Sequence, residues 1–306
     1  MNTALTNTTV IEQSKLHSAR PSFLGIVRGE LLKISRLWMT WIMLVMWLGV
    51  ITLPYLIAAT TPSTKEHLDA NALAFYYNEA FLNLSVLRIF SGFFLLILTA
   101  YVIGQEYQLG TIRILLARGV GRLQLLGAKL LTMGIIALAL FIGGLLINAI
   151  LSGILLSIVA GNLNSLSALT SAYWWNIWLY LLTILISMGV TILLATGVSV
   201  VGRVLAFGVS AAVAWFAVDN FGLLFLMLGY RATHNDAWLN VSAYVLGPNL
   251  NAMPTVILPA QLKAESVGIT PWVPVDGTHT LLVALVYALI FVGTAIFLTW
   301  KRDVKE

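Results

Sequence analysis

Few side chains in this 306-residue sequence could carry out catalysis. The chain has no cysteine, so it has no thiolate nucleophile, disulfide or cysteine metal site. It also has no HExxH pair, no clustered carboxylates and no G-x-x-x-x-G-K-[ST] phosphate loop. These absences argue against a zinc hydrolase, a carboxylate-based enzyme and ATP binding through that loop. We therefore expect no catalytic, metal or cofactor-binding residue in this chain.

The densest group of polar side chains interrupts two long apolar runs, in the segment GQEYQLGTIRILLARGVGRLQLLGAKLL from Gly104 to Leu131. Its cations are Arg113, Arg118, Arg122 and Lys129. One helical arc would hold the apolar residues Leu109, Ile112, Leu115 and Leu116. A glycine at Gly110 permits a sharp turn, and Thr111 can cap the helix that follows. The segment is therefore predicted to form a short, rigid, charged projection on which Glu106 also lies.

The elements that hold this segment are predicted to be membrane spans. The chain is 59% hydrophobic and 9% charged, with a mean hydropathy of +0.93, whereas soluble domains are about 45–50% apolar and about 25% charged. Apolar runs of about 20 residues mark spanning helices. We predict an all-α integral membrane protein with six transmembrane helices, at Trp38–Ala58, Leu84–Ile103, Leu130–Ala160, Trp174–Val200, Val204 to Val218 or Gly229, and Thr280–Trp300.

The distribution of positive charge predicts the orientation of these spans. Six spans place both termini on one side, and cytoplasmic loops carry an excess of Lys and Arg. Thirteen of the 17 basic residues lie on the side of the termini: Lys15, Arg20, Arg28, Lys33, Arg36, Arg113, Arg118, Arg122, Lys129, Arg203, Lys301, Arg302 and Lys305. The other side holds Lys65, Arg88, Arg231 and Lys263. Both termini are therefore predicted to be cytoplasmic in a multi-pass protein of the plasma membrane.

The same distribution accounts for the net charge of +5. Basic residues at the cytoplasmic face contact anionic membrane lipid, so nucleic acid is not expected as a partner.

The stretch before the first span, Pro21 to Leu37, has the pattern of an amphipathic helix that lies on the inner leaflet. Its apolar arc would hold Phe23, Leu24, Val27, Leu31, Ile34 and Leu37, and its polar arc Arg28, Lys33, Ser35 and Arg36. Glu30 falls inside the apolar arc and weakens the pattern. We divide the chain into a tail with this interfacial helix (1–37) and a six-helix transmembrane domain (38–306). The helix either leads into the first span or also docks a partner.

Two longer segments are predicted on the outer side. Ala59 to Asn83 is expected to form a short surface helix. Arg231 to His279 contains five prolines and the stretch AYVLGPNLNAMPTVILPA, which is too apolar for a free loop and too interrupted by proline to span. An outer re-entrant or hairpin segment before the last span is therefore expected to pack on the helix ends or to dip part way into the membrane.

The Gly104–Leu131 segment resembles the intracellular coupling region of ABC-2 type transport permeases. That pattern is a glutamate, a Gly-Thr pair, a Leu-Leu pair, a turn that ends in arginine, and a Gly/Ala-Lys pair at the next span. Its places are taken here by Glu106, Gly110, Thr111, Leu115, Leu116, Arg122 and Lys129. The proline that is common before the arginine is absent, and ARGVGR stands there instead.

The resemblance implies a permease subunit of an ATP-binding cassette transporter that exports a substrate. It also implies that ATP and Mg²⁺ bind to separate nucleotide-binding ATPase subunits, and that the permease pairs with a second copy or a paralogue. The residues that the resemblance assigns to ATPase coupling are Glu106, Gly110, Thr111, Arg113, Leu115, Leu116 and Arg122.

Polar side chains within the apolar runs suggest a substrate path. A stripe of small or hydroxylated residues on the fourth span includes Thr183, Ser187 and Thr191, and Asn148 lies on a similar line in the third. Such stripes usually allow helices to pack closely, and a substrate-lining face is the alternative. Asp219 is the acidic residue within the apolar stretches, and it lies either inside the membrane, as a functional group, or at the outer headgroups.

Two other functions remain possible from the sequence. A stand-alone ion-coupled transporter would normally show several buried titratable groups, but this chain offers at most Asp219. A membrane-embedded enzyme would need a nucleophile with a base, or a metal site, and neither is evident. Co-purification of an ATPase would favour the permease over both.

Overall fold

A computed structural model describes residues 22–258 and 267–301, and its regular elements are all helices. In these ranges five helices are long and apolar enough to cross a membrane: α3 (Trp38–Thr60), α5 (Ala72–Gln108), α7 (Arg122–Val159), α8 (Ser171–Gly202) and α13 (Gly277–Lys301). The pair α9 (Leu205–Phe221) and α10 (Leu223–Thr233) is bent by 43° and makes a sixth span if it is counted as one. The all-α membrane architecture is therefore confirmed, with five or six candidate spans.

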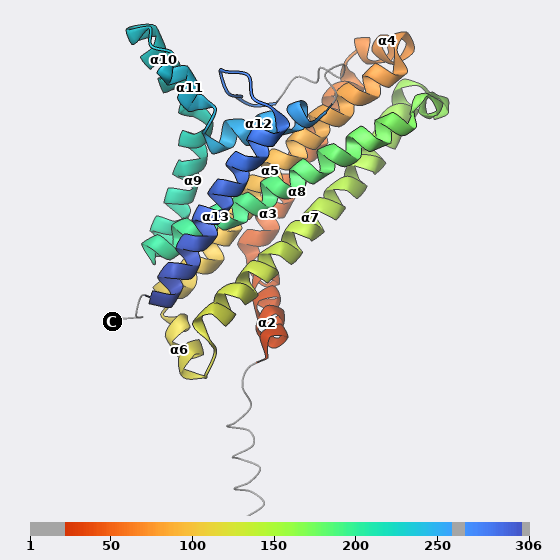
Figure 1. Cartoon of the computed structure of the whole chain (residues 1–306). Coiled ribbons are helices and arrows are strands. Elements are labelled where there is room, and N and C mark those ends of the chain that lie inside the picture. The colour runs from red at the N-terminus through yellow and green to blue at the C-terminus, as the bar shows by residue number, and fades with distance from the viewer. Residues whose placement is uncertain (1–21, 259–266, 302–306) are drawn as a thin grey trace, which may run out of the picture.

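The long helices run side by side between two ends of the molecule (Figure 1). One end carries α2 (Phe23–Ser35), α6 (Thr111–Ala117) and the last turn of α13, and we call it the α6 end. The opposite end carries α4 (Ser63–Ala70), η1 (Asn164–Ala168), α11 (Ala237–Ser242) and α12 (Leu246–Ile257). The segments predicted to be cytoplasmic and those predicted to be outer thus lie at different ends.

Helix α5 is the central element, and it contacts α3, α7, α8 and α9. Leu87, Leu95 and Leu98 on this helix are completely buried. By contrast, α3 and α13 turn much of their apolar surface outward, as at Val45 and Leu289. Outward apolar side chains on long apolar helices are what a lipid environment requires.

Two of the long helices extend beyond their predicted spans. Helix α5 begins at Ala72, twelve residues before Leu84, because Asn71 caps it by accepting the Ala74 N–H at 3.0 Å and because Tyr77 packs against Tyr173 of α8. Helix α7 already begins at Arg122. The polar connection between these two helices is therefore shorter than predicted, since it consists of α6 and two turns.

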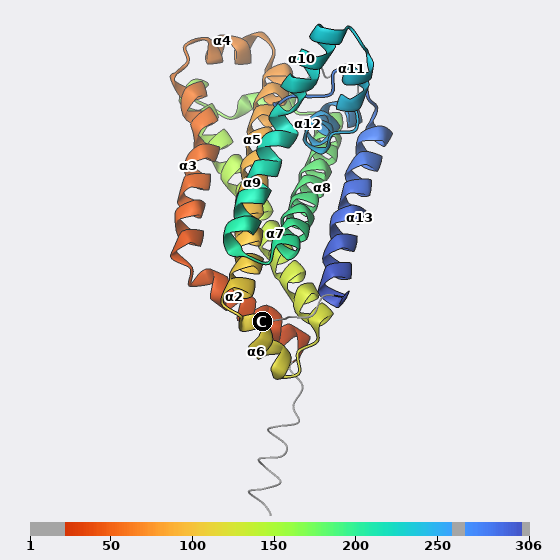
Figure 2. The same ribbon diagram turned by 90° about the vertical axis from the view of Figure 1, so that its left-hand side faces the viewer.

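Helix α2 crosses beneath the long helices at the α6 end (Figure 2). The Ser22 hydroxyl caps it by accepting the Gly25 N–H at 3.1 Å. Residues 1–21 of the predicted tail, which include Pro21, lie outside the described residues. The face that α2 buries consists of Val27, Glu30 and Ile34, whereas Leu24 of the predicted apolar arc is exposed. Glu30 therefore belongs to the buried face of this helix and does not interrupt it.

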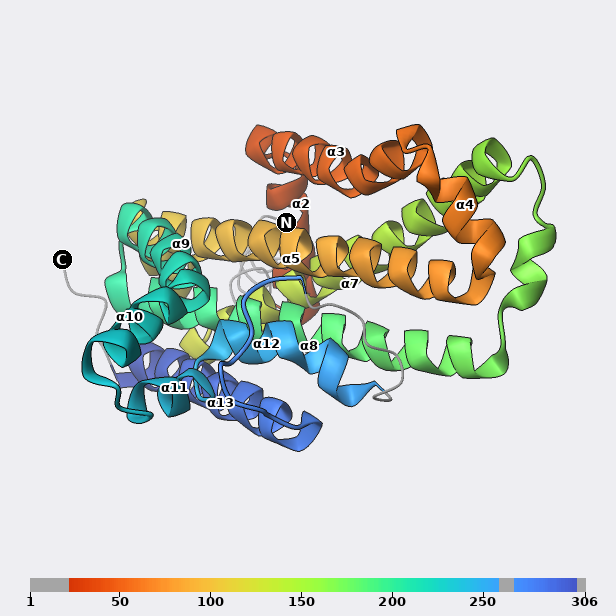
Figure 3. The same cartoon turned by 90° about the horizontal axis from the view of Figure 1, so that it is seen from above.

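The outer segments are largely helical. The predicted surface helix is α4, and the proline-rich stretch contains α12, most of which is buried. Figure 3 shows α12 from the opposite end, lying over α8 and next to α13, and it contacts both. Pro248 is accommodated because it stands in the first turn of α12, where backbone N–H groups need no helical partner. Residues 259–266 of the segment, with Lys263, lie outside the described part.

Candidate functional site

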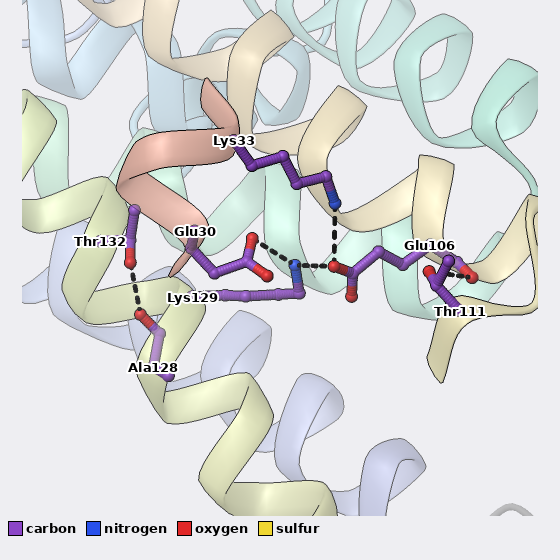
Figure 4. Close-up of polar contacts among 7 residues, drawn as sticks. All are labelled: Glu30, Lys33, Glu106, Thr111, Ala128, Lys129 and Thr132. Carbon is purple, nitrogen blue, oxygen red and sulfur yellow. Dashed lines mark hydrogen bonds and ion pairs between the residues drawn. The ribbon is translucent and has the colours of Figure 1, made fainter. Parts of the chain in front are cut away.

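Four charged side chains from three helices meet at the α6 end (Figure 4). Lys129 Nζ lies 2.8 Å from Glu106 Oε1 and 2.9 Å from Glu30 Oε2. Lys33 Nζ lies 3.0 Å from the same Glu106 oxygen. We call these four residues the charge cluster. Its two carboxylates and two ammonium groups balance, so the cluster as a whole carries no net charge.

Three members of the charge cluster are deeply buried. The side chains of Glu106, Lys129 and Glu30 are 3%, 5% and 8% exposed, whereas Lys33 is 34% exposed. Burial raises the pKa of the Glu30 carboxyl, and the negative charge of Glu106 adds to this effect while Lys129 opposes it. Because an unpaired buried charge costs several kcal/mol, each of these groups depends on the others to remain where it is.

The charge cluster connects helices that are far apart in the sequence. Lys129 and Glu30 are separated by 99 positions, and Lys33 and Glu106 by 73. Glu106 lies two residues before the end of α5, and Lys129 lies in the second turn of α7. The cluster therefore joins α2 to the bases of the two helices between which α6 is held.

Two tight turns hold α6 between α5 and α7. The first has Gly110 in the left-handed region, at φ 66°. Thr111 does not cap α6 with its side chain; its hydroxyl donates to the Glu106 carbonyl oxygen at 3.4 Å. In the second turn Gly119 has φ 83° and Val120 N–H donates to Leu115 O at 3.2 Å. The ARGVGR sequence thus uses a left-handed glycine, which favours this conformation.

One side of α6 faces inward. Ile112 and Leu116 line a small cavity of about 40 Å³ whose walls also include Glu106 and Lys129. At its edge, Arg122 Nη1 donates to the Trp300 carbonyl oxygen at 3.4 Å, which ties the start of α7 to α13.

The other side of α6 faces away from the protein. Ile114 is 54% exposed, and Leu109, which caps the end of α5 just before α6, is 62% exposed. Arg113 and Arg118 are exposed as well. We call these four residues the α6 surface. It combines two apolar side chains with two cations at the tip of the molecule.

The predicted coupling residues therefore occupy two different environments. Glu106, Leu116 and Arg122 border the inner cavity, Leu115 is half-buried, and Arg113 belongs to the α6 surface. Glu106 in particular is a buried anchor and does not lie on the projecting face on which the sequence placed it.

Sequence reasoning did not select Glu30, Lys33 or Ile114 as site residues. The one available signal was the position of Glu30 within an apolar arc, because a carboxylate at such a place needs a buried partner.

Three of the five residues predicted for a substrate path come together. Ser187, Thr191 and Asp219 line a cavity of about 80 Å³ among α5, α8, α9 and α12. The other two do not line it: Thr183 donates to the Tyr180 carbonyl oxygen of its own helix at 2.7 Å, and Asn148 Oδ1 of α7 accepts from the Tyr55 hydroxyl of α3 at 2.8 Å.

Two charged residues border the 80 Å³ cavity. Asp219 accepts hydrogen bonds from the backbone N–H groups of Leu246 and Gly247, at the start of α12. Arg88, which the charge count assigned to the outer side, lies within α5 and is buried. Its Nη2 donates to Asn251 Oδ1 at 3.0 Å. In the described ranges no group of three or more His, Asp or Glu side chains could hold a metal ion.

A family model described as "ABC-2 family transporter protein" matches residues 26–233. The matched region runs from α2 to the end of α10, so it includes the charge cluster and α6. The comparison with curated proteins gives no match.

Proposed function

The chain belongs to the ABC-2 transporter family, and from this premise we propose that it is the permease subunit of an ATP-binding cassette transporter. In this proposal, separate ATPase subunits bind ATP and Mg²⁺ and dock on the α6 surface. Their hydrolysis cycle drives export of a substrate across the cytoplasmic membrane. The permease pairs with a second copy or a paralogue, and it has no catalytic residue of its own.

One observation carries the proposal: α6 projects from the two longest helices of the described chain, and the charge cluster fixes the bases of those helices (Figures 1 and 4). None of the residues of α6 is fully buried, so α6 contributes little to the core. An isolated helix of seven residues is not stable in water. A partner that covers Ile114 of α6 and the adjacent Leu109 would explain why apolar side chains point outward at this tip.

The geometry also supports a mechanical route. A push on the α6 surface would pass through Ile112 and Leu116 to the bases of α5 and α7. The charge cluster holds these bases and α2 together, so the three helices would move as one rigid body. Because α5 contacts α8 and α9, its movement would reach the cavity that Ser187, Thr191 and Asp219 line.

The charge distribution supports a cytoplasmic α6 end. Nine basic residues of the described chain lie at that end: Arg28, Lys33, Arg36, Arg113, Arg118, Arg122, Lys129, Arg203 and Lys301. Lys65 and Arg231 lie at the opposite end. This asymmetry fits the positive-inside rule, and six spans with α9 and α10 counted as one would return the chain to the same side.

Co-purification from cells that produce both partners tests the docking. Ile114→Asp places a charge in the centre of the α6 surface, and Leu163→Asp makes the same change at a similarly exposed leucine at the opposite end. We expect Ile114→Asp to reduce the recovered ATPase at least about tenfold, as expected for a central interface residue, and Leu163→Asp to leave it unchanged. Equal recovery with the two variants would contradict docking on α6.

A further inference from the structure

Arg88 is a buried charged residue that belongs neither to the charge cluster nor to α6. This residue of α5 is 4% exposed, and a buried charge in a membrane span is costly unless it is paired. Asn251 Oδ1 accepts from Nη2, and the Tyr180 hydroxyl is a further polar neighbour. Neither partner is an anion. In the described ranges no carboxylate forms an ion pair with Arg88, and its Nε has no hydrogen-bond partner.

Arg88 borders a space that can hold a ligand group. The cavity measures about 80 Å³, whereas a single water needs about 10–15 Å³ on the same measure. Ser187 adds a hydroxyl to its wall, and Trp215 adds an aromatic face. The cavity therefore has room for a group of several atoms next to the guanidinium.

Asp219 borders the same cavity but is engaged elsewhere. Its carboxylate accepts the backbone N–H groups of Leu246 and Gly247, and the N-terminus of a helix favours a negative charge. Of the two charged groups that border this cavity, Asp219 is thus satisfied by α12, while Arg88 lacks an anionic partner.

We propose that this cavity binds an oxyanion group, a phosphate or a carboxylate, through the guanidinium of Arg88. A guanidinium presents its N–H groups as a planar fork that matches two oxygens of such a group. Asn251 accepts from one nitrogen of this fork, and its own Nδ2 donates to Ile269 O and Asn220 Oδ1, so Arg88 is held in place at the wall of the cavity. The proposal concerns binding alone, so it can fail or succeed independently of ATPase docking.

Thermal unfolding of the purified full chain in detergent, without an ATPase, tests the site. Phosphate, acetate and chloride are compared at constant ionic strength. We expect phosphate or acetate to raise the melting temperature of the wild type relative to chloride, and Arg88→Gln to remove this difference.

A second variant keeps the test informative if Arg88→Gln does not fold. Asp219→Asn removes a negative charge from the cavity wall while it keeps an oxygen that can accept from α12. We expect this variant to lower about fivefold the anion concentration that gives half of the maximal rise in melting temperature, because a like charge no longer opposes the ligand. An unchanged or higher concentration would contradict the proposal.

Native mass spectrometry of partly delipidated protein distinguishes the two sources of such a group. If the oxyanion belongs to a lipid headgroup, the wild type retains a phospholipid that inorganic phosphate displaces and that Arg88→Gln lacks. If it is a free anion, the melting temperature responds without a retained lipid. If neither the melting temperature nor lipid retention depends on Arg88, the cavity holds water only and the proposal is wrong.

Discussion

Lys129 Nζ and Glu106 Oε1 lie 2.8 Å apart although they come from different helices and both side chains are almost completely buried. This ion pair joins α5, which precedes α6 in the chain, to α7, which follows it. Lys129 also contacts Glu30 of α2, so it is the one ammonium group in the described chain that pairs with two carboxylates. We therefore expect Lys129 to be needed for a force on α6 to move α5, α7 and α2 together.

Replacement of Lys129 should be far more damaging than replacement of Lys33. Lys129→Met leaves two buried carboxylates with one partly exposed ammonium group, and breaking such a buried pair typically costs about 3–5 kcal/mol. Lys33→Met removes a partner that is partly solvated, so we expect a loss of about 1 kcal/mol or less. Denaturant unfolding in detergent measures both variants. Equal losses would show that the charge cluster does not depend on its buried lysine.

Substitutions of Gly110 test whether docking of the ATPase depends on the orientation of α6. Its φ of 66° is strained for a β-branched side chain, so Gly110→Val should tilt or unravel α6 and reduce ATPase co-purification. Gly110→Asn should be tolerated, because asparagine adopts the left-handed region more readily. No heavy atom would contact a Cβ at this position, so the two variants differ in backbone preference and not in steric clash. Similar recovery of the ATPase with Val and Asn would mean that this turn does not position the docking surface.

The absence of cysteine makes the orientation of the chain directly measurable. Single substitutions Ile114→Cys at α6 and Leu163→Cys at the opposite end create one reactive thiol each at exposed positions. In intact cells, a membrane-impermeant maleimide should label only Leu163→Cys, and in inverted vesicles from cells that produce the permease without the ATPase it should label only Ile114→Cys. The reverse pattern would place α6 outside the cell and remove it from contact with any cytoplasmic ATPase.

Hydrophobicity alone predicts most of the architecture of this chain. The five long helices and the bent α9–α10 pair fall on the predicted apolar runs, and α4 falls on the predicted outer helix. The helix ends were less predictable, because α5 extends outward through Tyr77, whose aromatic contact with Tyr173 comes from tertiary packing. Sequence patterns describe how apolar a segment is, but not which neighbour covers its ends.

The candidate site was predictable in its position but not in its chemistry. The Gly104–Leu131 segment does contain a projecting helix, yet Glu106 is buried beneath it because Lys129 and Lys33 approach from two other helices. Glu30 was recognised as a misfit in its arc, and its partner stands 99 positions away. A single sequence gives no indication of contacts at such a separation. The contact of Arg88 with Asn251 spans 163 positions and was equally unpredictable, although the predicted span Leu84–Ile103 already contains Arg88.

Substitution of Gly247 tests whether the contact between Asp219 and the start of α12 contributes to stability. A Cβ at this position would lie 2.8 Å from Asp219 Oδ2, so Gly247→Ala should displace the carboxylate and cost about 1–3 kcal/mol of stability. Gly293→Ala in α13 is the matched control, because no heavy atom lies within 4 Å of its Cβ position and alanine is the better helix former. Unfolding in detergent compares the two. If Gly247→Ala is as stable as Gly293→Ala, the contact between Asp219 and the start of α12 is not important for stability.

Site-specific photocrosslinking from position 114 tests the central claim most directly. A photoreactive amino acid is introduced in place of Ile114 or, as the control, of Leu163, and the adducts formed in intact cells are identified by mass spectrometry. We predict that position 114 yields an adduct with a protein that carries the phosphate-loop motif of an ATPase, and that position 163 does not. Adducts from position 114 that contain no such protein, or the same ATPase adduct from position 163, would contradict the claim that α6 is where the ATPase docks.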